Sequence, residues 1–360
     1  MPKLTKAFRC FLFLVLLSGI QFAAEEIKLP PLPAPISGNA VATLRVRGHQ
    51  MLFSFMGVGA ARTWDAVTNT GYYLDPGWEK WYPVRPVPGP VGRVAASAAS
   101  ARETVFLFGG YVIDPQNRGM VVPDVNAYAP ITGKWFRSSD IPVAVADSVS
   151  GVYRERYIYL IGGRSNQAVV PNVQVYDTQK NKWSQATPIP GTPVFGHAGA
   201  LLDDTIVLVD GAYRNSAAGA LPYLPSDQCW IGKIDRHNPA KIDWSKLTAH
   251  PGTARYGIAA GASEKEHKIY FSGGSATPVG YTGLGLDGKP AEVSAMTFAF
   301  NLRTSQWEVF EENTPNPTTN NRGLLITDEG LVMIGGMGKD QQPTARVMVL
   351  PLAPKTRESK

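Results

Sequence analysis

The chain has 360 residues, of which 44% are hydrophobic and 18% charged, a composition typical of a globular protein with a substantial core. The formal net charge is +6 without any run of lysine or arginine, so the sequence does not indicate nucleic-acid binding. The 36 glycines and 29 prolines exceed the usual share of these residues, and because both mark tight turns more than helix interiors, they predict many short strands.

The first residues have the pattern of a secretory signal. Three basic residues precede an apolar run from Cys10 to Ile20, and the small residues Ala23 and Ala24 follow. We therefore expect residues 1–24 to be a signal peptide and the mature protein to be periplasmic or secreted, with no membrane span after signal removal. An uncleaved membrane anchor is the alternative, although the apolar run is short for a bilayer span. With Cys10 in the signal, Cys229 has no partner for an intramolecular disulfide.

A phrase that begins with a short apolar run and closes on glycine occurs six times along the chain. The six runs are Leu52–Gly57, Val105–Gly110, Tyr157–Gly163, Ile206–Gly211, Ile269–Gly274 and Leu331–Gly336. Their closing glycines are 53, 53, 48, 63 and 62 residues apart. A period of this length predicts an array of similar structural units rather than a single irregular domain.

A tryptophan follows the apolar run in five of the six copies. In four of them it stands seven residues after an apolar or aromatic residue: Leu74 and Trp81, Tyr128 and Trp135, Tyr176 and Trp183, Phe300 and Trp307. In the fourth copy the corresponding residues, Ile234 and Trp244, are ten apart. An offset of seven suits two antiparallel strands joined by a tight turn, so the two side chains are expected to meet in one layer.

The glycine pair after a hydrophobic strand, followed by an aromatic residue and a tryptophan, resembles the kelch family of β-propellers. The resemblance implies an all-β fold, a six-bladed kelch-type propeller over residues 25–355, with a C-terminal tail at 356–360. The last copy lacks the tryptophan strand, and the segment Ile27–Pro33 has the outline of the missing strand. We therefore expect the N-terminus to supply the outer strand of blade six and close the ring, which removes exposed sheet edges.

Six polar residues recur near the start of the innermost strand of each blade, where the central channel opens. They are Asn39, Arg93, Asp147, His197, Arg255 and Arg322. If all six converge, they form a mildly cationic pocket suited to carboxylates or hydroxyl-rich ligands, with Tyr256 placed to stack on a sugar ring. The other four histidines are expected to lie in exposed turns.

Two long insertions follow the glycines of blades four and five, at residues 212–229 and 275–295. Loops of this length often cover a binding site, and Tyr213, Arg214 and Tyr281 are the candidates on them. The second insertion contains a G-x-G-x-x-G match that begins at Gly283, but Pro290 follows it and no strand-helix unit surrounds it. It does not indicate a nucleotide site.

The sequence is also similar to bacterial periplasmic sialic acid epimerases, which are exported six-bladed kelch propellers that speed sugar anomer exchange. The resemblance implies an acid/base pair at the channel, no cofactor, and arginines at the positions of Arg93 and Arg322. A metal site is not expected either, because no two of the five histidines stand at comparable loop positions as a ligand pair. In that family a glutamate follows the blade-four glycine, and here Ala212 stands in its place. Asp210 is the nearest carboxylate along the chain.

Two functional hypotheses follow. In the first, the propeller binds an acidic sugar such as a sialate and exchanges its anomers through Asp147, His197 or Asp210, while Arg255 neutralises the ligand carboxylate. In the second, the same mouth is a non-enzymatic interaction module that binds an acidic loop of a partner protein. A monomer is expected in either case, because a closed ring leaves no sheet edge to pair.

Overall fold

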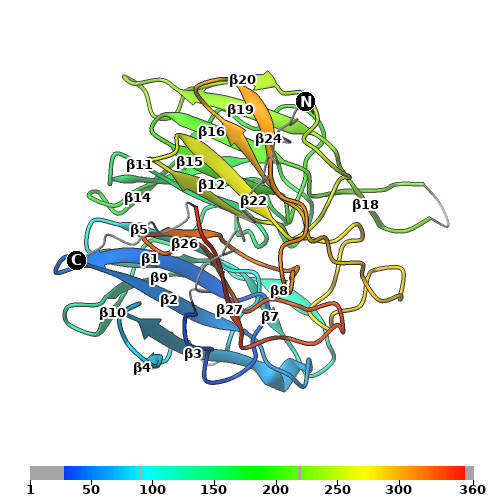
Figure 1. Ribbon diagram of the computed structural model, residues 1–360. Coiled ribbons are helices and arrows are strands. Elements are labelled where there is room, and N and C mark those ends of the chain that lie inside the picture. The colour runs from blue at the N-terminus through cyan, green and yellow to red at the C-terminus, as the bar shows by residue number, and fades with distance from the viewer. Residues whose placement is uncertain (1–27, 90, 218–219, 353–360) are drawn as a thin grey trace, which may run out of the picture.

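The computed structural model describes residues 28–89, 91–217 and 220–352, which form six antiparallel sheets arranged as a β-propeller (Figure 1). The predicted all-β propeller with six blades is confirmed. The predicted signal peptide at 1–24 and the tail at 356–360 lie outside the described residues. No helix in the described part of the chain is long and apolar enough to cross a membrane.

Each blade runs from the innermost strand outward. The strands of the first three blades are β1 (Ala40–Val46), β2 (His49–Val58), β3 (Val67–Leu74) and β4 (Tyr82–Val84); β5 (Ser97–Ala101), β6 (Thr104–Phe108), β9 (Val125–Ala129) and β10 (Lys134–Arg137); and β11 (Val149–Tyr153), β12 (Tyr157–Ile161), β13 (Val173–Asp177) and β14 (Lys182–Ala186). Those of the last three are β15 (Ala198–Leu202), β16 (Thr205–Val209), β19 (Cys229–Ile234) and β20 (Ile242–Lys246); β21 (Ala259–Ser263), β22 (Lys268–Ser272), β23 (Thr297–Asn301) and β24 (Gln306–Glu311); and β25 (Leu325–Thr327), β26 (Gly330–Ile334) and β27 (Val347–Leu350).

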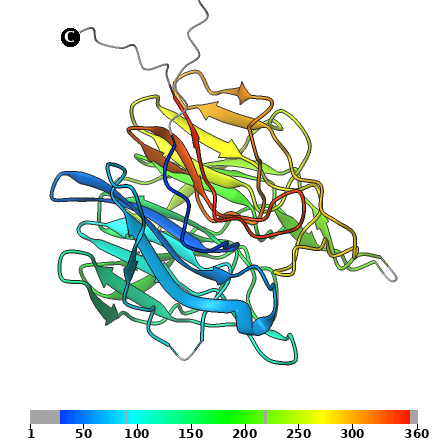
Figure 2. The ribbon, with the colours of Figure 1, turned by 60° about the horizontal axis from the view of Figure 1, so that its bottom comes forward.

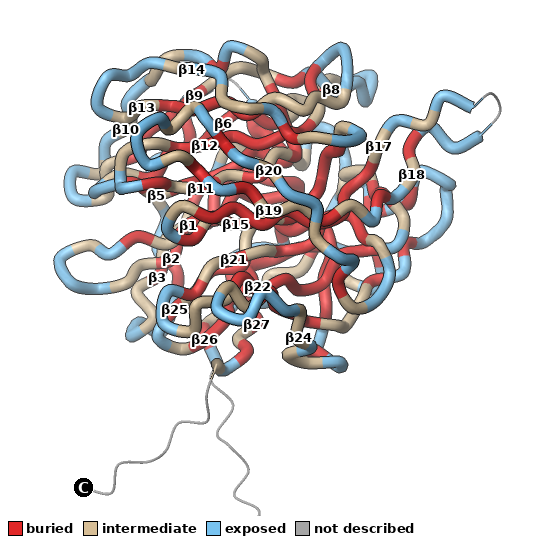
Figure 3. The backbone as a smooth tube through the Cα atoms, turned by 90° about the horizontal axis from the view of Figure 1, so that it is seen from above, coloured by how far each residue is buried: buried red, intermediate tan, exposed pale blue. Residues whose placement is uncertain are grey.

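Short elements occupy the connections between the second and third strands. A 3-10 turn, Trp64–Ala66, lies in blade one. Blade two carries the hairpin β7 (Tyr111–Ile113) and β8 (Gly119–Val121), and blade four carries the hairpin β17 (Ala212–Arg214) and β18 (Tyr223–Pro225). The blade-four hairpin projects from the body of the molecule (Figures 1 and 3).

The core lies between neighbouring blades. Apolar side chains of adjacent sheets pack in clusters, and Figure 3 shows the buried segments inside the blades with the exposed ones at the outer turns. Innermost strands contact those of the next blade around the whole ring, β25 and β1 included. Because both faces of each sheet are covered, the strands read as nearly continuous apolar runs.

The recurring tryptophans connect each blade to the preceding one by packing and by hydrogen bonds. Trp135, Trp183 and Trp307 lie directly opposite the aromatic residue seven positions earlier, as predicted. Each indole also donates a hydrogen bond to a carbonyl just after the outer strand of the preceding blade. These bonds join Trp135 to Arg85 (3.0 Å), Trp183 to Ser139 (3.0 Å), Trp244 to Thr187 (3.2 Å) and Trp307 to Thr248 (3.0 Å). Tryptophan suits this position because its large ring packs against the aromatic residue opposite and its indole N–H donates a hydrogen bond to the neighbouring blade.

The N-terminal segment takes the outer position of blade six. Trp81 of blade one donates to the Pro30 carbonyl (2.8 Å), so Pro30 stands where the outer segments of the other blades stand. Leu32 N donates to Ala345 O (2.8 Å), and Figure 2 shows the dark-blue N-terminal segment beside the red C-terminal strand. Leu29 and Leu32 are buried between blades six and one.

The predicted outer strand at Ile27–Pro33 is nevertheless not a regular strand. Ile27 lies outside the described residues, and the sheet of blade six has three named strands. Prolines stand at 30, 31, 33 and 35, and because proline has no N–H, this segment cannot form a continuous ladder. It is held instead by the Leu32 bond, an Ile36–Thr344 bridge and apolar burial.

Candidate functional site

A ring of backbone hydrogen bonds surrounds the axis just before the innermost strands. We call its six residues the belt; they are Gly38, Ala95, Asp147, Gly196, Gly257 and Asn320, each with φ between 55° and 66°. N–H groups of one blade donate to belt carbonyls of the preceding blade: Gly38 to Asn320, Ala95 to Gly38, Asp147 to Ala95, Gly196 to Asp147, Gly257 to Gly196, and Asn321 to Gly257. In each blade the left-handed conformation turns the backbone into the innermost strand. Glycine adopts this conformation without strain, which explains why three of the six belt residues are glycines.

Two cavities lie along the axis on either side of the belt. The channel cavity, about 370 Å³, is lined by the small residues of β1, β5, β11, β15, β21 and β25. The mouth pocket, about 360 Å³, is lined by Tyr111, Asp147, Arg164, Tyr223, Tyr256 and Arg322, with residues 278–281 and Leu286 over it. Asp147 and Arg322 line both cavities and so form the floor between them.

The floor is an ion pair between opposite blades. Arg322 leads into blade six and Asp147 into blade three, and their side chains, 8% and 4% exposed, form a salt bridge across the axis. Arg322 Nη2 also donates to Asn320 Oδ1 (2.8 Å). Burial raises the pKa of Asp147 above its usual value, and the charge of Arg322 and a hydrogen bond from Tyr256 only partly oppose that rise. Asp147 is therefore easier to protonate than an exposed aspartate.

Arg164 is a half-buried cation in the lining of the mouth pocket. It directly follows the glycine pair of blade three, and its backbone bridges Ala146, next to the belt. Its guanidinium lies over the ring of Tyr223 (5.2 Å) and near that of Phe195 (5.9 Å). Its charge also acts on Asp147, whose pKa it helps to lower. Within the described parts of the chain it forms no side-chain hydrogen bond or salt bridge, so its N–H groups remain available to a ligand.

The blade-five insertion covers the mouth pocket as a roof. Tyr281 Oη donates to Asn117 Oδ1 (2.7 Å) in the blade-two loop. Arg62 of blade one donates to the carbonyls of Thr282 (3.0 Å) and Gln341 (2.9 Å). The bonds at Tyr281 and Thr282 hold the insertion over part of the mouth, so the pocket is partly covered.

The six polar residues predicted at the mouth do not occupy equivalent positions. Relative to the belt residue of each blade, Arg93 and Arg255 lie two residues before it, Asp147 is the belt residue, Asn39 and His197 lie one after, and Arg322 lies two after. A shift of one residue along an extended chain turns a side chain to the opposite side. The prediction that all six converge on the mouth is therefore wrong, and only Asp147 and Arg322 line the mouth pocket.

Arg93, Arg255 and Asn39 are buried inside or between blades. Arg93 donates to Gly109 O (2.9 Å) and Asn126 Oδ1 (2.7 Å), and burial lowers its pKa to about 10. Arg255 lies over the ring of Phe298 (5.6 Å), away from the mouth, so it cannot neutralise a ligand there. Asn39 donates to Ser54 Oγ (2.9 Å) and Ile334 O (3.2 Å).

His197 lies below the belt, on the wall of the channel cavity. It occupies the position of Asn39 in its own blade and packs against Gly162, where a Cβ would come within 2.8 Å of the ring. Burial lowers the pKa of His197 to about 4, so the ring is neutral at pH 7. The structure separates it from the mouth pocket.

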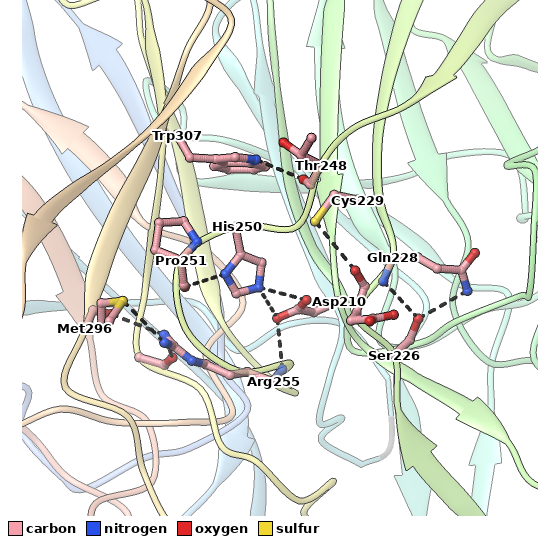
Figure 4. A network of polar contacts seen from close by, with 12 residues as sticks. Asp210, Ser226, Gln228, Cys229, Thr248, His250, Pro251, Arg255, Met296 and Trp307 are labelled. Atoms are coloured by element: carbon pink, nitrogen blue, oxygen red, sulfur yellow. Dashed lines mark hydrogen bonds and ion pairs between the residues drawn. The ribbon is translucent and has the colours of Figure 1, made fainter.

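Asp210 belongs to a buried network between blades four and five (Figure 4). Its carboxylate accepts hydrogen bonds from the Arg255 backbone N–H (2.9 Å), and His250 Nε2 lies 2.8 Å from Oδ2. Its side chain is fully buried, and the mouth pocket lies elsewhere. His250, expected in an exposed turn, is also buried and stacks on Phe298.

The blade-four insertion contributes a different tyrosine from the one predicted. Tyr213 and Arg214 lie on β17, outside the lining of the mouth pocket, whereas Tyr223 on the paired strand β18 lines it. Ala212 is fully buried and supplies no acid or base. Tyr256 does line the pocket, although Phe195 and Tyr223 pack around it rather than leaving a face open.

Tyr111 and Arg164 were missed by the sequence analysis. Both stand directly after the glycine pair of their repeats, and both bridge the residue just before the belt. The equivalent residues of the other blades are Val58, Ala212, Ser275 and Met337. Aligning the six copies on their glycines marks this position as the pocket wall, where two copies carry large polar side chains.

No group of three or more His, Cys, Asp or Glu in the described residues is placed to hold a metal ion. Cys229 is buried, and burial raises the pKa of its thiol to about 12. Neither observation points to a metal or thiolate centre.

Comparison with known proteins agrees with the fold. The kelch motif matches residues 149–190, which span blade three from β11 to just beyond β14. The chain carries a kelch motif. The solved structure of YjhT superposes with a TM-score of 0.69 at 19% sequence identity, over 89% of this chain and 95% of that one. No curated protein matches the sequence. At this identity the likeness concerns the fold alone.

Proposed function

We propose that this propeller binds a small sugar bearing a carboxylate in the mouth pocket. The single observation that carries the proposal is the Arg164 guanidinium, which lines a partly covered pocket and forms no salt bridge within the described chain. A guanidinium at the edge of a low-dielectric pocket favours an anionic ligand, because charge-assisted hydrogen bonds are stronger there than in water.

The rest of the pocket suits a sugar ring. Its volume of about 360 Å³ is near the lower end of the range for small-molecule sites. Tyr223 and Tyr281 offer aromatic surface for the C–H faces of a pyranose, and Asn117 and Asn320 offer amide groups for its hydroxyls. Apolar walls with a few polar groups are typical of specific ligand sites.

We propose further that the pocket speeds anomer exchange through Asp147. Ring opening needs the anomeric hydroxyl to lose a proton and the ring oxygen to gain one as the C–O bond breaks. The Asp147 carboxylate can accept the proton of the anomeric hydroxyl and deliver it to the ring oxygen, so that it is unchanged after ring opening. Ring closure on either face then reverses both transfers. Asp147 is the carboxyl in the pocket lining, and its raised pKa suits this exchange.

The alternative, capture of an acidic loop of a partner protein, has less support. Such a module needs an open, flat mouth, and here the blade-five insertion, held by bonds at Tyr281 and Thr282, covers part of the pocket. We therefore prefer a small ligand. We also propose export of the mature protein, based on residues 1–24, which N-terminal sequencing of the secreted or periplasmic fraction tests.

Calorimetry and NMR test the function together. Wild type is titrated with N-acetylneuraminate and D-glucuronate, and with the neutral sugars N-acetylmannosamine and D-glucose, and anomer exchange is followed by NMR. We expect the acids to bind and Arg164→Met to weaken them by at least tenfold, with neutral sugars little affected. Arg154→Met is the matched control, because Arg154 stacks on Tyr153 (4.7 Å) outside the mouth pocket. If neither acid binds to the wild-type protein, the proposal is contradicted. Exchange at the buffer rate contradicts only its catalytic part.

A further inference from the structure

The Tyr111 hydroxyl, in the wall of the mouth pocket, is buried and unpartnered. Tyr111 begins β7, and its ring packs in an apolar cluster with Val58 and Val94. Its Oη has no hydrogen-bond partner in the described structure. The neighbouring hydroxyls are engaged: Tyr281 bonds Asn117, and Tyr256 bonds Asp147.

A buried hydroxyl without a partner is unfavourable, and native structures seldom retain one without a reason. Tyr111 and Arg164 line the same pocket, and the charge of Arg164 acts on the Tyr111 hydroxyl. Burial raises the pKa of Tyr111 well above its usual value, so the phenol stays protonated and can donate a hydrogen bond. A ligand oxygen in the pocket would satisfy this donor.

We propose that Tyr111 is a specificity-determining residue, whose hydroxyl donates a hydrogen bond to the ligand carboxylate that Arg164 neutralises. This inference rests on the proposed function and deepens it. A pocket built to hydrogen-bond an oxygen discriminates strongly against ligands that lack one, because its own polar group is then left unpaired. Tyr111 and Arg164 together would therefore select an acidic sugar over its neutral counterpart.

Tyr111→Phe separates a ligand-binding role from a structural one. With the same four sugars, we expect the acids to bind about tenfold more weakly, while neutral sugars change little. In the absence of ligand, the Tm should stay the same or rise, because the variant removes an unsatisfied hydroxyl. The matched control is Tyr159→Phe, since Tyr159 Oη donates to Pro239 O (2.7 Å) outside the pocket. That variant should lower the Tm and leave binding unchanged.

The outcomes distinguish the inference from the function on which it rests. If wild type binds an acid and Tyr111→Phe binds it equally well, the inference is overturned and the proposed function stands. If Tyr111→Phe lowers the Tm as much as Tyr159→Phe, the hydroxyl has a structural partner and the inference is again overturned. If wild type binds no acid, both fail.

Discussion

Arg322 reaches across the propeller axis to Asp147, so an ion pair joins blade six to blade three. These blades are opposite in the ring, since the innermost strands follow one another around the axis in the order β1, β5, β11, β15, β21 and β25, and β25 contacts β1. The pair forms the floor of the mouth pocket and the roof of the channel cavity. This salt bridge therefore links two opposite blades of the propeller and also forms the floor of the mouth pocket.

Breaking this pair from one side should be strongly destabilising. We expect Arg322→Met to lower the free energy of unfolding by about 3–5 kcal/mol at pH 7, because it leaves the Asp147 carboxylate buried and uncompensated. Chemical denaturation measures the loss. The loss should shrink as the pH falls, because burial raises the pKa of Asp147 and the unpaired carboxyl takes up a proton.

The double variant Asp147→Asn with Arg322→Met is the control for that prediction. It removes both charges, and we expect it to be more stable than Arg322→Met alone at pH 7. Equal stability of the two variants would mean that the unpaired Asp147 carboxylate costs nothing, which would contradict the prediction.

His197 should make stability fall in mild acid. Its pKa is lowered from 6.5 to about 4 in the folded protein by burial, so between those values the unfolded state binds the proton and the folded state does not. The free energy of unfolding therefore falls as pH drops from about 6.5 to about 4, by up to about 3 kcal/mol from this group. Below that window its contribution levels off.

His197→Asn tests this window directly. Asparagine occupies the equivalent position in blade one, at Asn39, so the substitution suits the local geometry. We expect denaturation curves of the variant to depend less on pH between 6.5 and 4 than those of wild type. A parallel pH dependence would show that other groups are responsible.

The N-terminal segment should be essential to the fold. We expect Leu32→Ala to lower the free energy of unfolding by about 2–5 kcal/mol, because Leu32 is 4% exposed between blades six and one. Leu221→Ala, at a leucine that is 39% exposed, should change it by less than about 0.5 kcal/mol. Similar effects at the two positions would mean that the ring does not depend on its N-terminal closure.

Substitutions at two small residues of the belt should change the free energy of unfolding by different amounts. Gly257 has φ +66°, and a Cβ there would lie 2.8 Å from Asn320 N, so Gly257→Ala should cost about 2 kcal/mol or more. Ala95 already carries a Cβ at φ 58°, and Ala95→Gly should stay within about 1 kcal/mol of wild type. Denaturation midpoints compare the two, and a loss at Ala95 equal to that at Gly257 would contradict the role of the belt.

The candidate site could be predicted only in part, and the errors share one cause. Counting residues from each proline placed Arg93, Arg255 and His197 beside Asp147, but their offsets from the belt differ by one or two residues. Alternate residues of an extended chain face opposite sides. An error of one residue in the alignment therefore predicts a pocket location for a guanidinium that is in fact buried within or between the blades. Asp210 was close to the mouth in sequence but is bound by His250 and the Arg255 backbone.

By itself the sequence determined the architecture of this protein. The six glycine-closed runs and the tryptophans are local, repeated signals, and each unit can bury its faces only against similar neighbours, so they specify a ring of six sheets. Tertiary structure alone decided the site. The contacts between Arg322 and Asp147, and the gathering of Tyr111 and Arg164 in one pocket, join residues of different blades. Distances across the axis depend on how the whole ring closes, and no local pattern encodes them.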